Sequence, residues 1–383
     1  MSEPGVALIG TGFIGPVHLE ALRRIGAPVV GVLGSSPERS RQAAAALGVP
    51  RAYTSLDDLL ADEAVQVVHI TSPNSAHFEQ ARRSLEAGRH VVCEKPLALT
   101  SAETGALVAL AQRSGLVAAV NYNLRFYPLV IEARERIRRG DIGQVLHITG
   151  SYVQDWLLNE TDFNWRVLAD QSGATRAVGD IGTHWLDLLS YISGTEVASV
   201  CADLATFLPV RQRPLGSVQT FTSGGAAAAG GTAPVAIQTE DYGSILLRYR
   251  GGAHGCLTVS QVTAGRKNCL RYEIAGSKGA LAWESERPNE LWLGRRERAN
   301  ELLLRDPALL SETAAAFTSY PGGHNEGFPD TFKQLYRAIY ADIRASRPAA
   351  TPAYATFADG HNEALLCEAI LQSQREGGWV DVA

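Results

Sequence analysis

Cysteine is scarce in this sequence, and its few positions are scattered. The five residues, Cys93, Cys201, Cys256, Cys269 and Cys367, are odd in number, and no two of them form a C-x-x-C pair. This spacing argues against a disulfide framework and against a cysteine-rich metal site, and it fits reduced thiols in a cytoplasm. We therefore expect a cytoplasmic protein.

Long hydrophobic runs and an excess of basic residues are also missing. No apolar run approaches about 18 residues and no signal-peptide pattern opens the chain, so neither a membrane span nor a leader is expected. The 383 residues carry 35 Lys and Arg against 40 Asp and Glu, a formal charge of −5. Nucleic acid and anionic membranes both require a basic face, so we expect neither as a partner.

The chain opens with a glycine-rich motif between an apolar run and a helical pattern. Residues 6–9 are apolar, and Gly10, Gly12 and Gly15 then form G-x-G-x-x-G. The first glycine permits a tight turn, the second lets a pyrophosphate approach the backbone, and the third lets helix and strand pack closely. The motif predicts a dinucleotide site at the helix N-terminus; the alternative is a glycine turn without a ligand.

Apolar strands and helices then alternate up to residue 123. Strands are expected at 27–34, 65–71, 89–96 and 116–123, with helices at 36–48, 75–88 and 100–115 between them. This alternation indicates a doubly wound parallel sheet, which binds ligands beyond the carboxyl ends of its strands. That edge carries the candidate cofactor residues Gly10, Thr11, Gly12, Phe13, Ile14, Ser35, Ser36, Arg39, Thr71, Pro73, Asn74, Glu94, Lys95 and Asn123.

The end of the second strand bears on the choice of cofactor. NAD-binding folds usually place Asp or Glu there to bind the ribose hydroxyls, whereas this chain has Gly34-Ser35-Ser36-Pro37-Glu38-Arg39. Small hydroxyls and an arginine one turn into the helix suit a 2′-phosphate, although Arg39 is equally suited to be a surface helix residue. The sequence favours NADP over NAD.

The second half has a different pattern. A helix is expected at 129–143, a strand at 144–156, and hairpins at 243–262 and 270–285 that turn at Gly251-Gly252 and at 277–279. They indicate an α+β domain with a large, mostly antiparallel open sheet. We expect a Rossmann dinucleotide-binding domain at 1–125 and a substrate-binding and oligomerisation domain at 126–383, with the final helix packing back towards the first domain. The low-complexity stretch 216–234 is expected to be a mobile surface loop.

One helical stretch of the second half carries chemistry. Within 177–194, Asp180 and His184 are four residues apart and share a helix face, with Asp187 three residues further on. An aspartate beside a histidine can orient the imidazole and raise its basicity, as a general base requires. The alternatives are a helix cap with a polar core residue, or a metal site, for which no further ligand cluster is evident. We expect no metal.

Taken in order, these motifs resemble the Gfo/Idh/MocA family of NAD(P)-dependent oxidoreductases. The resemblance rests on G-T-G-x-x-G, on Glu94-Lys95-Pro96 and on D-I-G-x-H-x-x-D at 180–187. S-P-N-x-x-H at 72–77, S-K-G-A-L-x-W at 277–283 and the final helix extend it over nearly the whole chain, and the first of these adds His77 to the cofactor candidates.

The resemblance implies a mechanism in which a secondary alcohol loses a hydride to nicotinamide and a proton to a base. Lys95 matches the family's cleft lysine, which precedes a cis proline, while His184 matches its catalytic histidine and Asp180 the acidic residue before it. His184 is the expected base. Lys95 would hydrogen-bond the developing alkoxide and help to relay the proton, and Glu94 would orient Lys95 and the nicotinamide ribose.

The chain departs from the family pattern just before this motif. Where the family often has G-G-G-x-L, this sequence has S-G-A-T-R-A-V-G at 172–179. Arg176 either points to the cleft and selects an unusual substrate, or it is a surface substitution.

Side chains that suit a carbohydrate lie between the two predicted domains. Aromatic faces match the C–H faces of a sugar or cyclitol, and polar groups match its hydroxyls. Besides Lys95, Asp180 and His184, the candidates are Arg125, Tyr152, Asp155, Trp156, Trp165, Arg166 and His324. Trp156 and Trp165 equally suit core packing, and His324 equally suits a turn.

The leading hypothesis is an NAD(P)-dependent dehydrogenase or reductase of a ring alcohol in a sugar, sugar derivative or inositol. One alternative is an enzyme that uses a tightly bound cofactor for transient oxidation, giving glycoside cleavage, elimination or epimerisation. Another is a non-catalytic dinucleotide- or sugar-sensing regulator, but a regulator has no need of both Lys95 and His184. The related fold buries its open sheet in a dimer or tetramer, so we expect a homo-oligomer.

Overall fold

The computed structural model describes residues 3–215 and 231–382 of the chain. Most of the predicted mobile loop at 216–234 therefore lies outside the described residues, while its last part belongs to the strand β10 (Thr232–Ala236). None of the helices in the described ranges has the length and apolar character that crossing a membrane requires.

Within the described residues, the first half forms a six-stranded parallel sheet in the order β3-β2-β1-β4-β5-β6. Its strands are β1 (Val6–Ile9), β2 (Val29–Leu33), β3 (Arg51–Ala52), β4 (Val67–Ile70), β5 (His90–Cys93) and β6 (Ala118–Val120). All residues of β1 and β4 are buried, because helices cover both faces of the sheet. The predicted doubly wound Rossmann sheet is thus confirmed.

The helices that connect these strands begin and end close to the predicted positions. They are α1 (Ile14–Arg24), α2 (Pro37–Leu47), α3 (Leu56–Ala61), α4 (His77–Glu86) and α5 (Ser101–Ser114), with the single turn η1 (Asn74–Ala76) before α4. Ser36 caps α2 by accepting from the backbone N–H of Arg39, and Thr100 and Glu103 form the expected capping box on α5.

The second half forms a mixed sheet of nine described strands in the order β16-β15-β14-β13-β7-β12-β11-β8-β17. The strands are β7 (Val145–Val153), β8 (Val197–Ala205), β11 (Tyr242–Tyr249), β12 (His254–Ser260), β13 (Cys269–Gly276), β14 (Ala280–Glu284), β15 (Glu290–Gly294), β16 (Glu301–Leu304) and β17 (Val380–Asp381). Among the described pairs, β7 and β12 run parallel and the others antiparallel, so the prediction of a mostly antiparallel sheet is confirmed. A separate ribbon pairs β9 (Val210–Pro214) with β10.

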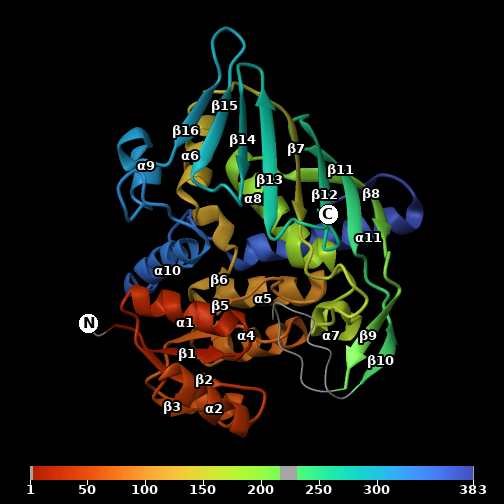
Figure 1. Cartoon of the computed structure of the whole chain (residues 1–383). Coiled ribbons are helices and arrows are strands. Elements are labelled where there is room, and N and C mark those ends of the chain that lie inside the picture. Colours follow the sequence, from red (N-terminus) through yellow and green to blue (C-terminus); the bar gives the residue numbers. More distant parts are fainter. Residues whose placement is uncertain (1–2, 216–230, 383) are drawn as a thin grey trace.

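Helices pack on one face of the large sheet (Figure 1). The elements of the second half are η2 (Asn123–Phe126), α6 (Pro128–Arg138), η3 (Trp165–Val167), α7 (Ala169–Ser172), the π-helix η4 (Val178–Gly182), α8 (Thr183–Ser193), η5 (Pro307–Leu309), α9 (Glu312–Ala315), α10 (Phe328–Arg344) and α11 (Phe357–Glu376). In β11, Ile245 and Leu247 face this core and are 1% exposed, whereas Leu246 between them points to the opposite face and is 51% exposed.

The two long C-terminal helices return to the first sheet. Helix α10 lies beside α1 (Figure 1), and its Phe332, Leu335 and Ile339 share a core with Val6 and Ala21. Helix α11 packs against both α5 and β8, so it contacts both sheet units. The division of the chain at residue 125 stays a prediction, since C-terminal residues complete the core of the first unit.

Candidate active site

A cavity of about 930 Å³ opens at the carboxyl edge of the first sheet and is closed on its far side by residues of the second half. The residues that line it from the first half are Ile9–Ile14, Leu33–Ser35, Thr71–Asn74, Ala76, His77, Gln80, Glu94, Lys95, Asn123 and Leu124. Those from the second half are Tyr152, Gln154, Trp165, Arg166, Asp180, Ile181, His184, Lys267, Asn268, Phe328 and Phe332.

The glycine loop forms one end of this cavity by close backbone contacts. Gly10 has a φ of +100°, and a Cβ placed on it would lie 2.5 Å from the backbone of Thr71. A Cβ on Gly15 would lie 2.5 Å from the carbonyl oxygen of Gly10, so this glycine allows α1 to pack against the turn. A Cβ on Gly12 would meet no described atom within 4 Å, and Gly12 lines the cavity. The loop therefore fits the pyrophosphate of a dinucleotide, which would approach the backbone at Gly12 and the start of α1.

The end of β2 places only part of the predicted ribose site on the cavity wall. Leu33, Gly34 and Ser35 line it, whereas Ser36 and Arg39 do not. Ser36 uses its hydroxyl to cap α2, and the side chain of Arg39 is exposed on that helix. Among the described lining residues, the acidic ones are Glu94 and Asp180, both distant in the chain from β2.

Lys95 follows β5 and reaches across the cavity to the second half. The Lys95–Pro96 peptide bond is cis, as the family resemblance implied. The Lys95 ammonium donates to the carbonyl oxygen of Asp180 at 2.7 Å and to its carboxylate Oδ1 at 2.8 Å. Gln261 Nε2 donates to the other carboxylate oxygen at 2.9 Å, and Arg166 Nε lies 3.4 Å from Oδ1. Burial would raise the pKa of the Asp180 carboxyl, but the charges of Lys95 and Arg166 outweigh it and hold that pKa well below its usual range.

His184 lies in the cavity wall without the predicted aspartate partner. Asp180 binds Lys95 and Gln261, and His184 Nδ1 is buried with no hydrogen-bond partner among the described residues. The expectation that Asp180 hydrogen-bonds the imidazole is therefore wrong for this structure. The reason is the π-helical turn η4, because its five-residue hydrogen-bond spacing breaks the four-residue register of an α-helix.

The surroundings of His184 keep its imidazole neutral. The ring meets Tyr122 edge-on, with a centroid distance of 5.4 Å. Burial and then the Lys95 charge lower the pKa of His184 from 6.5 to about 3. The imidazole is therefore neutral at neutral pH and can accept a proton, but as a weaker base than pairing with Asp180 was expected to make it.

Glu94 lines the cavity and is held in place by a buried network. Its Oε1 accepts from Asn121 Nδ2 at 2.6 Å and lies 3.0 Å from His18 Nε2, and its Oε2 accepts from the backbone N–H of Lys95 at 3.2 Å. Burial opposes ionisation, but the hydrogen bond and charge of His18 lower the pKa of Glu94 below its usual value. Glu94 thus contacts the backbone of the residue that it was expected to orient.

Several predicted substrate residues lie outside the cavity wall. Arg125 is buried in ion pairs with Asp187 and Asp359, so its guanidinium is not available to a substrate in the cavity. Asp187 is thus engaged by Arg125, whereas Asp180 binds Lys95 and Gln261. His324 is exposed, in a turn that Arg305 binds through its carbonyl.

Asp155 and Trp156 support the wall from behind. Trp156 Nε1 donates to Gln154 Oε1 at 2.8 Å, and Asp155 binds Lys267 Nζ at 2.6 Å. Gln154 and Lys267 line the cavity in place of these two residues.

Arg176 takes neither of its two predicted positions. It is 1% exposed and does not line the cavity, and its guanidinium binds Asp241 and Thr239. The chain thus replaces the family's glycine-rich stretch with a buried arginine.

Sequence reasoning missed part of the wall formed by the second half. Tyr152 OH and Gln154 Nε2 both donate to Asn268 Oδ1 at 2.7 Å. Gln154 follows Tyr152 by two residues and has the same strand periodicity, so alternation could have identified it. Asn268 comes close only because β13 pairs with β7 in the register that sets Cys269 opposite Val153. No local pattern indicates that register.

Comparison with protein families gives two matches that together cover most of the chain. Residues 5–122 match the "oxidoreductase family, NAD-binding Rossmann fold" of the Gfo/Idh/MocA proteins. Residues 130–282 match the "GFO/IDH/MocA C-terminal domain".

Named dehydrogenases and reductases are similar over most or all of their length. The levoglucosan dehydrogenase of Pseudarthrobacter phenanthrenivorans is 31% identical, covering 100% of this chain and 99% of that protein. The 1,5-anhydro-D-fructose reductase of Ensifer adhaerens is 27% identical over 80% of this chain and 84% of its own length.

Solved structures agree with this relationship. The structure of levoglucosan dehydrogenase with NADH and L-sorbose has a TM-score of 0.88 at 29% identity, with 100% of both chains covered. An inositol dehydrogenase homologue from Azotobacter vinelandii in complex with NAD+ has a TM-score of 0.87 at 27% identity, covering 100% of this chain and 98% of that one. The chain belongs to the Gfo/Idh/MocA family of oxidoreductases, and its first half is that family's NAD(P)-binding Rossmann domain.

Proposed function

We propose that the protein transfers a hydride between a nicotinamide cofactor and a ring secondary alcohol of a sugar, sugar derivative or inositol. The observation that carries this proposal is the presence of Lys95 and a neutral His184 in one cavity with the glycine loop. A cation and a neutral base beside a dinucleotide site are the groups that oxidation of an alcohol requires.

The bound nicotinamide would supply the hydride acceptor, or the donor in the reverse direction. Gly10, Gly12 and the start of α1 would hold its pyrophosphate, as argued above. Glu94 would fix the position of Lys95 through the Lys95 backbone N–H.

Lys95 would bind the reacting oxygen. An ammonium has three N–H donors, and Asp180 accepts from two of them in this structure. The third can donate to the substrate oxygen, where it stabilises the negative charge that develops as the hydride leaves. His184 would accept the hydroxyl proton during oxidation and return it during reduction. Asp180 acts on this pair by fixing the ammonium.

The far wall suits a ring that carries several hydroxyls. The Arg166 guanidinium stacks on the Trp165 ring at 4.4 Å, and Tyr152, Gln154 and Asn268, which line the same cavity, form a hydrogen-bonded row. Substrate hydroxyls that replace hydrogen bonds of this row would be recognised by their positions on the ring. The names of the relatives, a levoglucosan dehydrogenase, an anhydrofructose reductase and an inositol dehydrogenase homologue, support a sugar or cyclitol.

For the cofactor we propose NADP. The wall at the end of β2 has Gly34 and Ser35, whereas an acidic residue there would repel a 2′-phosphate. The exposed Arg39 lies one turn into α2, and its long side chain could extend to a 2′-phosphate bound at this wall. The relatives with solved complexes hold NADH or NAD+, so cofactor choice is a point on which this chain would differ from them.

The experiment that tests the function is a screen of sugars and cyclitols with each cofactor, followed by nicotinamide absorbance. Wild-type protein should reduce NADP with at least one ring alcohol, while Lys95→Ala and His184→Ala should bind the cofactor and turn over far more slowly. If wild type binds cofactor but reduces it with none of the compounds, the proposal fails.

We also propose a cytoplasmic homo-oligomer. All five cysteines are free, as in a reducing compartment. Leu146 and Leu246 are 49% and 51% exposed on the face of the large sheet that the helices leave open, and a second copy of the chain would cover them. Light scattering of wild type and of Leu246→Glu tests this, because the charge should shift the assembly towards the monomer.

A further inference from the structure

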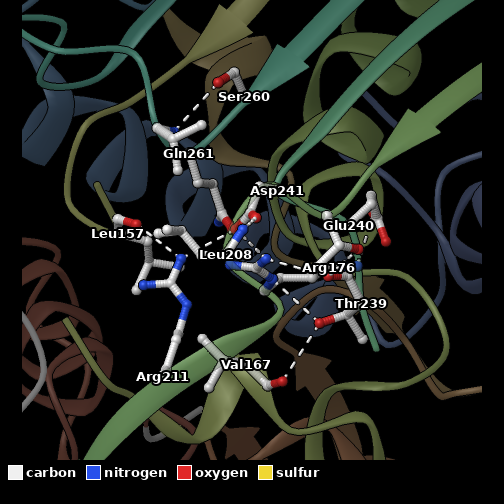
Figure 2. A network of polar contacts seen from close by, with 12 residues as sticks. Leu157, Val167, Arg176, Leu208, Arg211, Thr239, Glu240, Asp241, Ser260 and Gln261 are labelled. Atoms are coloured by element: carbon white, nitrogen blue, oxygen red, sulfur yellow. Dashed lines mark hydrogen bonds and ion pairs between the residues drawn. The ribbon is translucent and has the colours of Figure 1, made fainter. Parts of the chain in front are cut away.

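Behind the cavity lies a buried charge network that the proposed reaction does not use. Arg176, Arg211 and Asp241 all have side chains that are 0% exposed, and both guanidinium groups bind Asp241 Oδ1 (Figure 2). Asp241 Oδ2 accepts from the backbone N–H of Leu208 at 2.8 Å. Three charges are costly to bury, so a role beyond filling space is worth seeking.

One arm of this network holds the segment 157–167. We call it the wall segment because its Trp165 and Arg166 line the cavity. Arg211 Nη1 donates to the carbonyls of Asn159 and Asp162 at 2.9 and 3.0 Å, and Nη2 donates to that of Leu157 at 2.8 Å. The first half of the wall segment is thus fixed by one planar fork of donors.

The other arm reaches the end of the wall segment. Arg176 Nε donates to Thr239 Oγ1 at 3.2 Å, and that hydroxyl donates to the carbonyl of Val167 at 3.3 Å (Figure 2). Val167 directly follows Arg166, so this link lies one residue from the part of the wall that faces the substrate.

Arg176 also begins the turn that carries Asp180. The carbonyl of Arg176 accepts from the backbone N–H of Asp180 at 2.7 Å. Glu240 Oε1 accepts from the N–H groups of Arg176 and Val178 at 2.8 and 2.9 Å, which fixes the start of η4. Asp241 is therefore linked through Arg176 both to the wall segment and to η4, the turn that carries Asp180.

Gln261 closes the network towards the reacting groups. Its backbone N–H donates to the carbonyl of Asp241 at 3.0 Å, its carbonyl accepts from Leu157 at 3.2 Å, and its side chain binds Asp180. A shift of Asp241 would thus move the wall segment and Asp180 together.

We propose that the Asp241–Arg176–Arg211 network sets substrate specificity by fixing the wall segment relative to Asp180. This inference rests on the proposed function and adds positioning residues to it: Arg211 and Thr239 act through the wall, and none of the three network residues touches the substrate. Arg176 lies in the stretch 172–179, where the chain departs from its family's glycine-rich pattern.

The test uses Arg211→Lys, with Arg138→Lys on the exposed surface of α6 as the matched control. Lysine keeps the charge beside Asp241 but cannot reach three carbonyls, so the wall segment should loosen while the ion pair persists. The sugar KM should rise about tenfold, the loss expected for a hydrogen bond to a charged group, with kcat and the cofactor Kd within about twofold of wild type. The control should match wild type.

Selectivity gives a second readout. The ratio of kcat/KM for two sugars that differ in one hydroxyl should fall towards one in Arg211→Lys, because a loose wall no longer reads that position. A folded Arg211→Lys with unchanged KM and unchanged selectivity would overturn the inference, and so would an equal loss of sugar and cofactor binding.

Hydrogen–deuterium exchange separates this inference from the proposed function. Amides of 157–167 should exchange faster in Arg211→Lys than in wild type and Arg138→Lys, whether or not any sugar is oxidised; unchanged exchange there overturns the inference. If Arg211→Lys does not fold, Thr239→Val takes its place, since it removes only the hydroxyl between Arg176 and Val167 and should raise exchange and KM in the same direction. Unchanged exchange and KM in a folded Thr239→Val would then be the contradicting result.

Discussion

The two ends of the cavity are built in different ways. At the cofactor end, Gly10, Gly12 and Gly15 bring backbone groups to the ligand, and their neighbours in space follow from one turn between a strand and a helix. At the substrate end, side chains from distant parts of the chain meet, and buried ion pairs hold them. The first end is therefore recognisable from a short motif, while the second depends on the whole fold.

The junction of the two ends should show the largest effect. Replacing Lys95 by methionine removes the cation that spans the cavity to Asp180 but keeps much of the side-chain volume. We expect kcat to fall by about 10³-fold, because charge stabilisation and proton transfer are both lost. Steady-state kinetics and a cofactor titration measure this, and NADPH should still bind. Turnover of Lys95→Met at the wild-type rate would refute the mechanism.

The glycines allow a comparison within the cofactor end. Gly12→Val should lower cofactor affinity about a hundredfold or more with unchanged thermal stability, since its side chain enters open space and blocks hydrogen bonds worth ~1.5–3 kcal/mol each. Gly10→Ala should instead destabilise the fold by about 1–3 kcal/mol, because φ is +100° and the Cβ meets the Thr71 backbone. Fluorescence titration and thermal unfolding distinguish the two effects. Equal effects of both substitutions on stability would contradict this division.

The acid side of the pH profile reports on the substrate end. His184 acts as a base in its neutral form, and its pKa is lowered from 6.5 to about 3, so the neutral form persists as pH falls through 6.5. At about pH 5, the neutral fraction of a histidine with the ordinary pKa would be lower by about 30-fold, whereas His184 should still be neutral and fully active. The kcat/KM profile, recorded where circular dichroism shows intact structure, tests this. An inflection near 6.5 that is absent in His184→Ala would contradict it.

The smallest expected effect concerns the 2′ position of the cofactor ribose. Arg39→Ala should weaken NADPH binding about tenfold and leave NADH binding unchanged, because only the phosphate gains from the guanidinium. Arg41→Ala is the matched control, since Arg41 is on the same helix and is paired with Glu38. Tighter binding of NADH than of NADPH by wild type would refute the choice of NADP.

Local chemistry allowed much of the fold to be predicted. The cap at Ser36, the box at Thr100 and Glu103, and the hairpin at Gly251-Gly252 each depend on a few neighbouring residues. The cavity-lining residues of the parallel edge could likewise be placed, because every parallel strand ends at the same side of its sheet.

The predictions that failed depended on distant partners or on backbone irregularity. Arg176 lies beside Asp241, 65 residues away in the chain, and nothing local to 172–179 indicates that contact. The π-turn before His184 breaks a spacing that assumed a regular α-helix. The guanidinium of Arg125 has the chemistry to bind a substrate, but it is engaged in ion pairs with Asp187 and Asp359.

Transfer of a labelled hydrogen tests the central claim most directly. The substrate found in the screen would carry deuterium on the carbon of the reacting alcohol, and the cofactor would be examined by mass spectrometry and NMR after turnover. The account predicts deuterium at C4 of the reduced nicotinamide, with Lys95→Met transferring it far more slowly. Product formation with the deuterium retained in the sugar product, or lost to water, and no net reduced cofactor would contradict a net dehydrogenase.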